Sequence, residues 1–425
     1  MYHTSKIFPF NYSTHNLANG LKVILVPMKN QGLVSYYTVV RTGSRDEWEP
    51  GKSGFAHFFE HIMFRGTEKY SSALYDKIIT SIGANANAYT SDDLTVFHLS
   101  FAGEDLEKVI ELESDRFQNL KYNLQEFQTE AGAILGEYLQ GRSNPWSLAF
   151  EKLHKLAFDE HPYKHTTIGF EEDIREMPNL YEFSLHFFEK HYRPENSVIV
   201  ICGDFQPQEA INYVMKYYSD WRTGHVPPVI NPEPEQLTGR EAEIIYHGKT
   251  MPLLLLGYKS DAFNINNKNM TASVLLAELA FGSTSEIYKK LILREQKVQL
   301  LRADFGFSRD PKLFYINSMV NNPFLMNYVR NEIFAIIAYY QNCLVDNARL
   351  ENLKRRERYT FLMNMNTAEN VASFLAQFIA LTGGIEVIDE LYCKLQDITP
   401  QDIMEAANYY FAPEKRNIVY LNEKI

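Results

Sequence analysis

Cysteine is scarce in this chain, which has only three among its 425 residues. Cys202, Cys343 and Cys393 lie far apart and their number is odd. This excludes a disulfide framework and a thiolate zinc site. Three unpaired thiols favour a reducing compartment.

Long hydrophobic runs are also missing. The densest apolar stretch, Met251 to Tyr258, is far shorter than the ~20 residues that span a bilayer. The segment from Met1 to Tyr12 has no apolar core of the kind found in secretory signals. The sequence therefore predicts no membrane span and a cytoplasmic location, with the periplasm as the alternative if a signal peptide has been removed.

Positive charge is not in excess, and the formal net charge is −11. An acidic surface repels phosphate groups, so nucleic acids and anionic membrane surfaces are excluded as partners. Hydrophobic residues make up 45% and aromatic residues 14% of the chain, which allows large cores. A single core stops growing at about 250–300 residues, so this length predicts two domains.

The two halves of the chain repeat one order of elements: two strands, helices, a further strand, more helices and a final strand. A proline-rich stretch from 223 to 240 separates them and predicts an extended linker. We therefore expect domains at 1–222 and 241–425. The predicted strands are 21–27, 33–40, 94–101, 197–202, 243–246, 253–258, 313–320 and 417–421, and the predicted helices are 55–64, 104–120, 124–140, 270–281 and several between 325 and 411.

This order indicates an internal duplication. Phe64-Arg-Gly-Thr resembles Phe281-Gly-Ser-Thr, and aligning Gly66 with Gly282 supports the repeat. In this alignment His57, Glu60 and His61 fall on Ser273, Leu276 and Ala277. If the halves are repeats, only the first therefore keeps the polar site at these positions.

The segment His57-Phe-Phe-Glu60-His61 has the pattern H-x-x-E-H. Histidines four residues apart lie on one face of a helix and can share a metal ion. Glu60 leans toward the same face and can take a proton from an activated water. The alternative is a solvated polar stripe, but the flanking phenylalanines predict a buried helix, in which His and Glu need partners. The pattern is the inverzincin signature.

A catalytic zinc usually has a third protein ligand. The predicted helix 124–140 offers Glu126, Glu130 and Glu137 as candidates. Glu130 and Glu137 are seven residues apart and share a face, so one can bind the metal while the other orients a ligand. The alternative is a surface helix with solvated glutamates.

The sequence resembles the pitrilysin/insulinase family of zinc metallopeptidases, in particular its short bacterial members and the subunits of mitochondrial processing peptidase. The match covers nearly the whole chain and is most specific from Gly43 to Glu47 and from Gly51 to His61. The resemblance implies that the third zinc ligand is Glu137, because the family's ligand lies about 76 positions beyond the second histidine. It implies a supporting role for Glu130.

The resemblance also implies that the segment around Asn87 and Ala88 is an edge strand that binds the substrate backbone by strand addition. The residue pattern alone favours a turn rich in Asn and Ala. Relatives carry a substrate-binding Arg and Tyr in the second half, and here Leu313 stands where the arginine is expected.

The implied fold is α+β, with two homologous domains that each pack helices on a mixed, mainly antiparallel sheet and together form half of a clamshell chamber. A second chain is then needed, as a homodimer or as a heterodimer with a related subunit. The implied activity is that of an endopeptidase with one Zn²⁺ per chain, which cleaves short or unfolded peptides or matures one particular precursor. His and Glu ligands also accept cobalt or manganese. The alternative is a non-catalytic or partner-dependent subunit.

Overall fold

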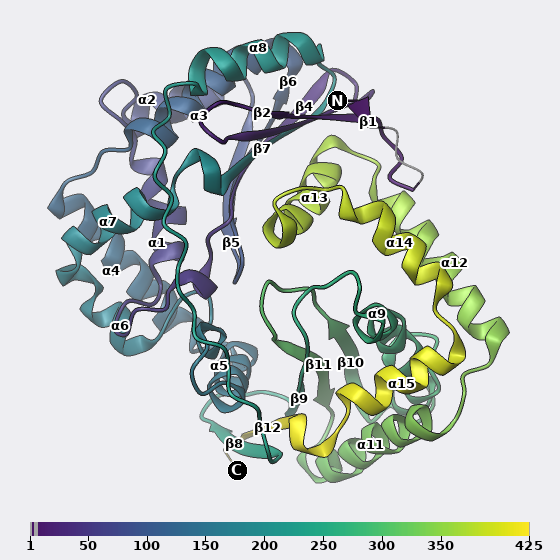
Figure 1. Cartoon of the computed structure of the whole chain (residues 1–425). Helices are drawn as coiled ribbons and strands as arrows, with labels where there is room; N and C mark the ends of the chain where they lie inside the picture. The colour runs from purple at the N-terminus through teal and green to yellow at the C-terminus, as the bar shows by residue number, and fades with distance from the viewer. Residues whose placement is uncertain (1, 4–6, 425) are drawn as a thin grey trace. The chain divides into compact units, whose positions relative to one another are not determined.

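The computed structural model describes residues 2–3 and 7–424, which form two compact units. Unit 1 comprises the described residues up to Tyr138 together with Thr167–Ile230 and Phe361–Asp389. Unit 2 comprises Leu139–Thr166, Asn231–Thr360 and the described residues from Glu390 onward. Each unit packs helices against one mixed sheet (Figure 1), which confirms the predicted α+β class. Each unit consists of several separate segments of the chain, so no single boundary divides the two units. The domain boundary that we expect between residues 222 and 241 therefore stays a prediction.

The sheet of unit 1 has the strand order β1-β2-β3-β7-β4-β6-β5. Strands β3 and β7 are parallel, and the other neighbours are antiparallel. Strand β5 therefore forms one edge of the sheet. The strands are β1 (Tyr2–His3), β2 (Tyr12–Asn16), β3 (Lys22–Pro27), β4 (Leu33–Val40), β5 (Asn85–Thr90), β6 (Thr95–Ala102) and β7 (Ser197–Gly203).

The sheet of unit 2 has the order β10-β11-β9-β12-β8, and only β8 and β12 are parallel. This order matches β5-β6-β4-β7-β3 of unit 1 strand for strand, including the one parallel pair, so the predicted duplication is visible in the topology. The strands are β8 (Arg240–Tyr246), β9 (Leu253–Lys259), β10 (Val298–Phe305), β11 (Leu313–Val320) and β12 (Arg416–Glu423).

Two helices pack on the sheet that lies farther from them in sequence. Helix α5 (Pro145–Ala157) lies between β6 and β7 in the sequence but packs on β8, β9 and β12 of unit 2. Helix α13 (Ala368–Thr382) lies between β11 and β12 in the sequence but packs on β4 and β7 of unit 1. Each sheet is therefore completed by a helix from the other half of the sequence.

The remaining helices cover the sheets or connect their strands. Those of unit 1 are α1 (Phe55–Ile62), α2 (Ser72–Ser81), α3 (Leu106–Asn119), α6 (Glu171–Glu176), α7 (Tyr181–His191) and α8 (Pro207–Tyr218). Those of unit 2 are α9 (Lys268–Phe281), α10 (Glu286–Tyr288), α11 (Met326–Asn342) and α15 (Pro400–Tyr410), with a π-helical segment at Lys289–Arg294. Helices α4 (Leu124–Gly141), α12 (Asn347–Asn364) and α14 (Val387–Asp397) each cross a unit boundary.

Within the described ranges, no single helix has both the length and the apolar composition that crossing a membrane requires. The pair α13 and α14, bent by 90°, meets these criteria only when the two helices are counted together.

Candidate metal centre

Helix α1 carries the H-x-x-E-H segment, and it forms because its apolar face is buried and its first turn is capped. Phe55, Phe58, Phe59 and Ile62 are fully buried in the core of unit 1. The buried Glu47 carboxylate accepts hydrogen bonds from the N–H groups of Gly54, at 2.7 Å, and Ala56, at 2.6 Å. An anion at this end of a helix satisfies orphan N–H groups and interacts favourably with the helix dipole.

Gly54, which precedes the helix, has a positive φ of 94°. A Cβ atom here would lie 2.7 Å from the carbonyl oxygen of Ile168. Both the backbone conformation and the close approach therefore require glycine at the start of the helix.

The side chains of His57, His61 and Glu137 converge, as the sequence predicts for a metal site. The two Nε2 atoms lie 3.3 Å apart. Oε2 of Glu137, from α4, lies 3.5 Å from Nε2 of His57 and 3.7 Å from Nε2 of His61. Ligands of a tetrahedral zinc with bonds of about 2.0–2.1 Å are separated by roughly 3.3–3.5 Å. The three atoms therefore have nearly the spacing that one zinc ion requires.

The electrostatics of the histidines also suit a metal. Burial lowers the pKa of His57 to about 4, so its imidazole is neutral at pH 7 and can offer a lone pair. Nδ1 of His57 is buried and has no hydrogen-bond partner among the residues that the structure describes. His61 differs, because the hydrogen bond from its Nδ1 to Glu130 raises its pKa. That bond also directs Nε2 of His61 toward His57 and Glu137, which is the tautomer that a metal needs.

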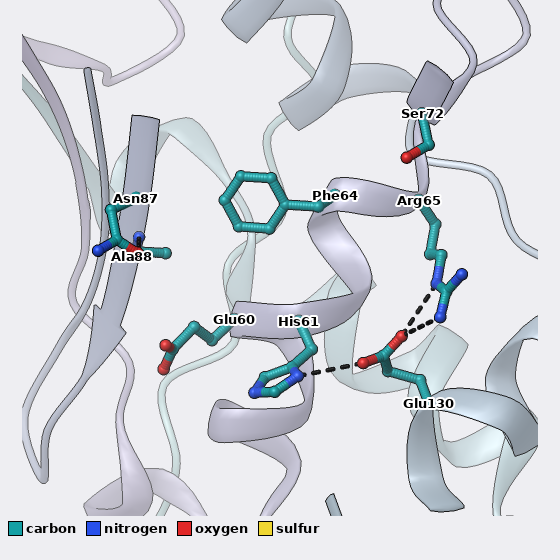
Figure 2. A pocket seen from close by; sticks show the side chains of 8 residues that line it. All are labelled: Glu60, His61, Phe64, Arg65, Ser72, Asn87, Ala88 and Glu130. Atoms are coloured by element: carbon teal, nitrogen blue, oxygen red, sulfur yellow. Dashed lines mark hydrogen bonds and ion pairs between the residues drawn. The ribbon is translucent and has the colours of Figure 1, made fainter. Parts of the chain in front are cut away.

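Glu130 supports the site through two neighbours (Figure 2). Its Oε1 accepts from Nδ1 of His61 at 3.1 Å, and its Oε2 accepts from Nε and Nη2 of Arg65 at 2.9 and 2.5 Å. The hydrogen bond with His61 is the largest cause that lowers the pKa of Glu130. Sequence reasoning missed Arg65, although its place four residues after His61 on the same face was a usable signal.

Glu60 lies beside the histidines and points toward β5 (Figure 2). Its Oε2 accepts a hydrogen bond from Oγ1 of Thr90, the last residue of β5, at 2.7 Å. This bond fixes the Glu60 carboxylate beside the histidines.

Strand β5 carries Asn87 and Ala88, so the turn favoured by the residue pattern alone is wrong and the edge strand implied by the resemblance is present. A cavity of about 350 Å³ lies between this strand and α1. Its lining residues come from α1, α2, α4, β5 and the turn after α1 (Figure 2): Glu60, His61, Phe64, Arg65, Ser72, Asn87, Ala88 and Glu130.

Two other candidates fall outside the centre. Glu126 is half-buried and caps its own helix, because its Oε2 accepts from the N–H of Asn123 at 2.8 Å. Leu313 is buried in β11 of unit 2 and cannot replace an arginine that binds substrate.

Two family models match the chain in succession. Residues 22–170 match the model "Insulinase (Peptidase family M16)", and residues 181–357 match "Peptidase M16 inactive domain". The chain therefore belongs to the insulinase family, peptidase family M16.

Among the relatives, the chain is 26% identical to a zinc protease, PqqE, of Helicobacter pylori over 99% of this chain and 94% of that protein. It is 28% identical to the beta subunit of the mitochondrial-processing peptidase of Rattus norvegicus, over 65% of this chain and 56% of that one. A solved protease from Helicobacter pylori has the same fold, with a TM-score of 0.91, 24% identity and coverage of 97% of this chain and 99% of that chain.

Proposed function

We propose that this chain is a zinc-dependent endopeptidase that holds one Zn²⁺ through His57, His61 and Glu137 and uses Glu60 as its catalytic base. The proposal rests on the triangle of candidate ligand atoms at 3.3, 3.5 and 3.7 Å, with the Glu60 carboxylate held beside it by Thr90. The zinc protease relative supports the choice of metal.

A zinc ion in this position would act as a Lewis acid that acidifies water and polarises a peptide carbonyl. Glu60 takes the proton of the attacking water and returns it to the leaving amine. The Thr90 hydroxyl holds Glu60 in position for both transfers. Glu130 keeps the proton of His61 on Nδ1.

The substrate binds as an extra strand at the edge of β5, next to Asn87 and Ala88, and this favours short or unfolded peptides. The N–H of Ala88 donates to Oδ1 of its neighbour Asn87 at 2.9 Å. A carbonyl oxygen of the bound peptide replaces Oδ1 of Asn87 as the acceptor. The N–H of Ala88 therefore has a hydrogen-bond partner both with and without substrate.

The decisive test compares the wild type with Glu60→Gln, by metal analysis and by hydrolysis of a quenched-fluorescent peptide mixture. The amide keeps the shape of the side chain but cannot take a proton. We expect one zinc per chain in both proteins and a loss of turnover of ~10²–10⁴-fold in the variant. Full activity in the variant would remove Glu60 from the mechanism.

A second proposal is that the chain works only with a partner. One relative is named as a subunit of a processing peptidase, and one solved relative from Pseudomonas fluorescens is described as an inactive domain. The clamshell chamber needs four such domains, so a homodimer or a heterodimer supplies the other two. Zinc without turnover in the isolated chain, followed by activity after a related subunit is added, would favour the heterodimer over an autonomous peptidase.

The cellular location of the protein is also a proposal. We propose the cytoplasm, and the periplasm is the alternative because an Escherichia coli relative, PqqL, is described as a periplasmic protease. Fractionation of cells that express the full gene distinguishes these compartments.

A further inference from the structure

The outer edges of the two sheets differ at strands β3 and β8, which occupy the same place in the shared strand order. In unit 1 the edge of β3 is paired with β2 in antiparallel register, from Ser13 opposite Leu25 to Asn16 opposite Lys22. In unit 2, among the described residues, β8 pairs only with β12. A sheet edge without a partner presents backbone N–H and C=O groups that can pair with another strand.

A cavity of about 600 Å³ lies beside this open edge, within unit 2. It is bounded by α5, by the residue Arg142 before it and by the end of β8. The lining residues are Arg142, Leu148, Glu151, Lys152, Lys155, Ile244, Ile245, Tyr246, His247 and Gly248. The cavity beside the edge of β8 is therefore large enough to hold side chains of a bound peptide.

The α5 side of the cavity is cationic. Leu148, Glu151, Lys152 and Lys155 follow a spacing of three and four residues, so they share one face of the helix. With Arg142 the lining carries three permanent cations and one carboxylate, although the whole chain has a net charge of −11. A positive cavity on an acidic protein is electrostatically complementary to an acidic ligand.

Strand β8 turns alternate side chains toward this helix. Tyr246 donates from its hydroxyl to the carbonyl oxygen of Ser143 at 2.6 Å, and Arg240 donates to the carbonyl oxygen of Leu156 at 2.8 Å. Glu243, in the alternate position, bonds with Asn422 of β12 and is exposed. A strand added beside β8 would likewise direct every second side chain toward Lys152 and Lys155.

We propose that the edge of β8 and this cavity form a docking site for an extended acidic segment of another polypeptide, bound as an added strand with its carboxylates facing α5. Main-chain hydrogen bonds to β8 hold the segment, and the lysines select for acidic side chains at alternate positions. The proposed docking site belongs to unit 2, whereas the candidate metal centre belongs to unit 1, and the proposal does not depend on the activity of that centre.

The test measures binding of a fluorescein-labelled, end-blocked octapeptide of alternating glutamate and valine to full-length Glu60→Gln protein, which spares the probe from cleavage. We expect saturable binding that weakens as salt is raised, and at least tenfold weaker binding to the same protein with Lys152→Glu and Lys155→Glu. Bound probe should slow amide hydrogen exchange in residues 240–248.

The matched control carries the same change of charge at Lys29→Glu and Arg222→Glu, two exposed positions that do not line the cavity. It should bind the probe as well as the parent does. An octapeptide of alternating lysine and valine should not bind, and replacing each valine by proline should abolish binding because proline cannot donate to a strand.

Four results would overturn the proposal. Equal binding to the Lys152 and Lys155 variant excludes the cationic face, and protection of β5 instead of β8 places the peptide elsewhere. Competition by free glutamate at concentrations similar to the probe's would reveal a small-anion site. Self-association of the wild type that is lost in the variant, without probe binding, would assign the edge to a second copy of this chain.

Discussion

Helices α1 and α9 follow corresponding strands, β4 and β9, yet only α1 carries a polar site. In the alignment of the repeats, Glu60 corresponds to Leu276, which is fully buried. Two of the three polar side chains that α1 contributes to the site have a hydrogen-bond partner on another element: Glu130 for His61 and Thr90 for Glu60. The comparison shows that the same scaffold holds polar residues on this helix where neighbouring elements also supply hydrogen-bond partners.

The largest effect should follow from removing a metal ligand. His57→Ala should lose the zinc and reduce peptide hydrolysis by at least ~10³-fold, because the metal supplies both the acidified water and the polarised carbonyl. Ser273→Ala, at the aligned position of α9, is the matched control and should keep both. Metal analysis and a fluorogenic assay measure the two quantities, and metal loss in the α9 variant would break the comparison.

Exchanging the residues at the aligned positions sharpens the comparison. Leu276→Glu should lower the free energy of unfolding by roughly 3–5 kcal/mol, because it buries a carboxylate without a partner. Glu60→Leu should abolish turnover but cost about 1 kcal/mol or less, since it loses one hydrogen bond with Thr90. Urea denaturation of the two variants measures the difference. Equal stability losses would mean that the two helices have similar surroundings.

The exchanged helices α5 and α13 allow the two units to be compared directly. Leu153→Ala in α5 and Leu375→Ala in α13 each remove a fully buried side chain, so each should cost about 2–5 kcal/mol. Exposed Gln377→Ala in α13 is the control and should change stability little. Denaturation curves would contradict this prediction if either leucine variant were as stable as the control.

The smallest effect concerns the residue behind a ligand. Glu130→Gln weakens the acceptor for His61 and should reduce zinc affinity about 10–100-fold without abolishing binding. Glu126→Gln, a change on the same helix at a residue that does not contact the histidines, should leave the affinity unchanged. Competition with a chromogenic chelator measures both values. A wild-type affinity in Glu130→Gln would show that His61 is oriented by other contacts.

Local patterns predicted the elements that bury a continuous apolar face. Strands β4 and β11 match the predicted ranges 33–40 and 313–320, and α4 matches to within one residue at its end. Strand β10 and helices α5, α7 and α8 were not predicted. The swap of α5 and α13 between sheets could not be predicted either, because a helical period shows that a face is buried but does not identify the surface that covers it.

The residues of the candidate site likewise divide into those that a local motif predicts and those that depend on contacts between distant parts of the chain. His57, Glu60 and His61 form a local motif, so their proximity could be predicted from helix geometry alone. Glu137 lies far from this motif in the sequence. Residue spacing alone did not distinguish it from Glu126 and Glu130 as the third ligand, and only the family resemblance did. The spacing of Arg65 from His61 placed it on the same helix face, but its pairing with Glu130 is a tertiary contact, as is the hydrogen bond from Thr90 to Glu60, and no local pattern contains these contacts.

The position of α13 in the sequence has a consequence for synthesis on the ribosome. The strands of the first sheet emerge early, but the helix that covers β4 and β7 emerges only near the end of the chain. At roughly 5–20 residues per second, the uncovered sheet waits on the order of ten seconds or more for this helix. During that time its apolar face is open to aggregation, so a nascent chain of this protein should depend on chaperones until translation is almost complete.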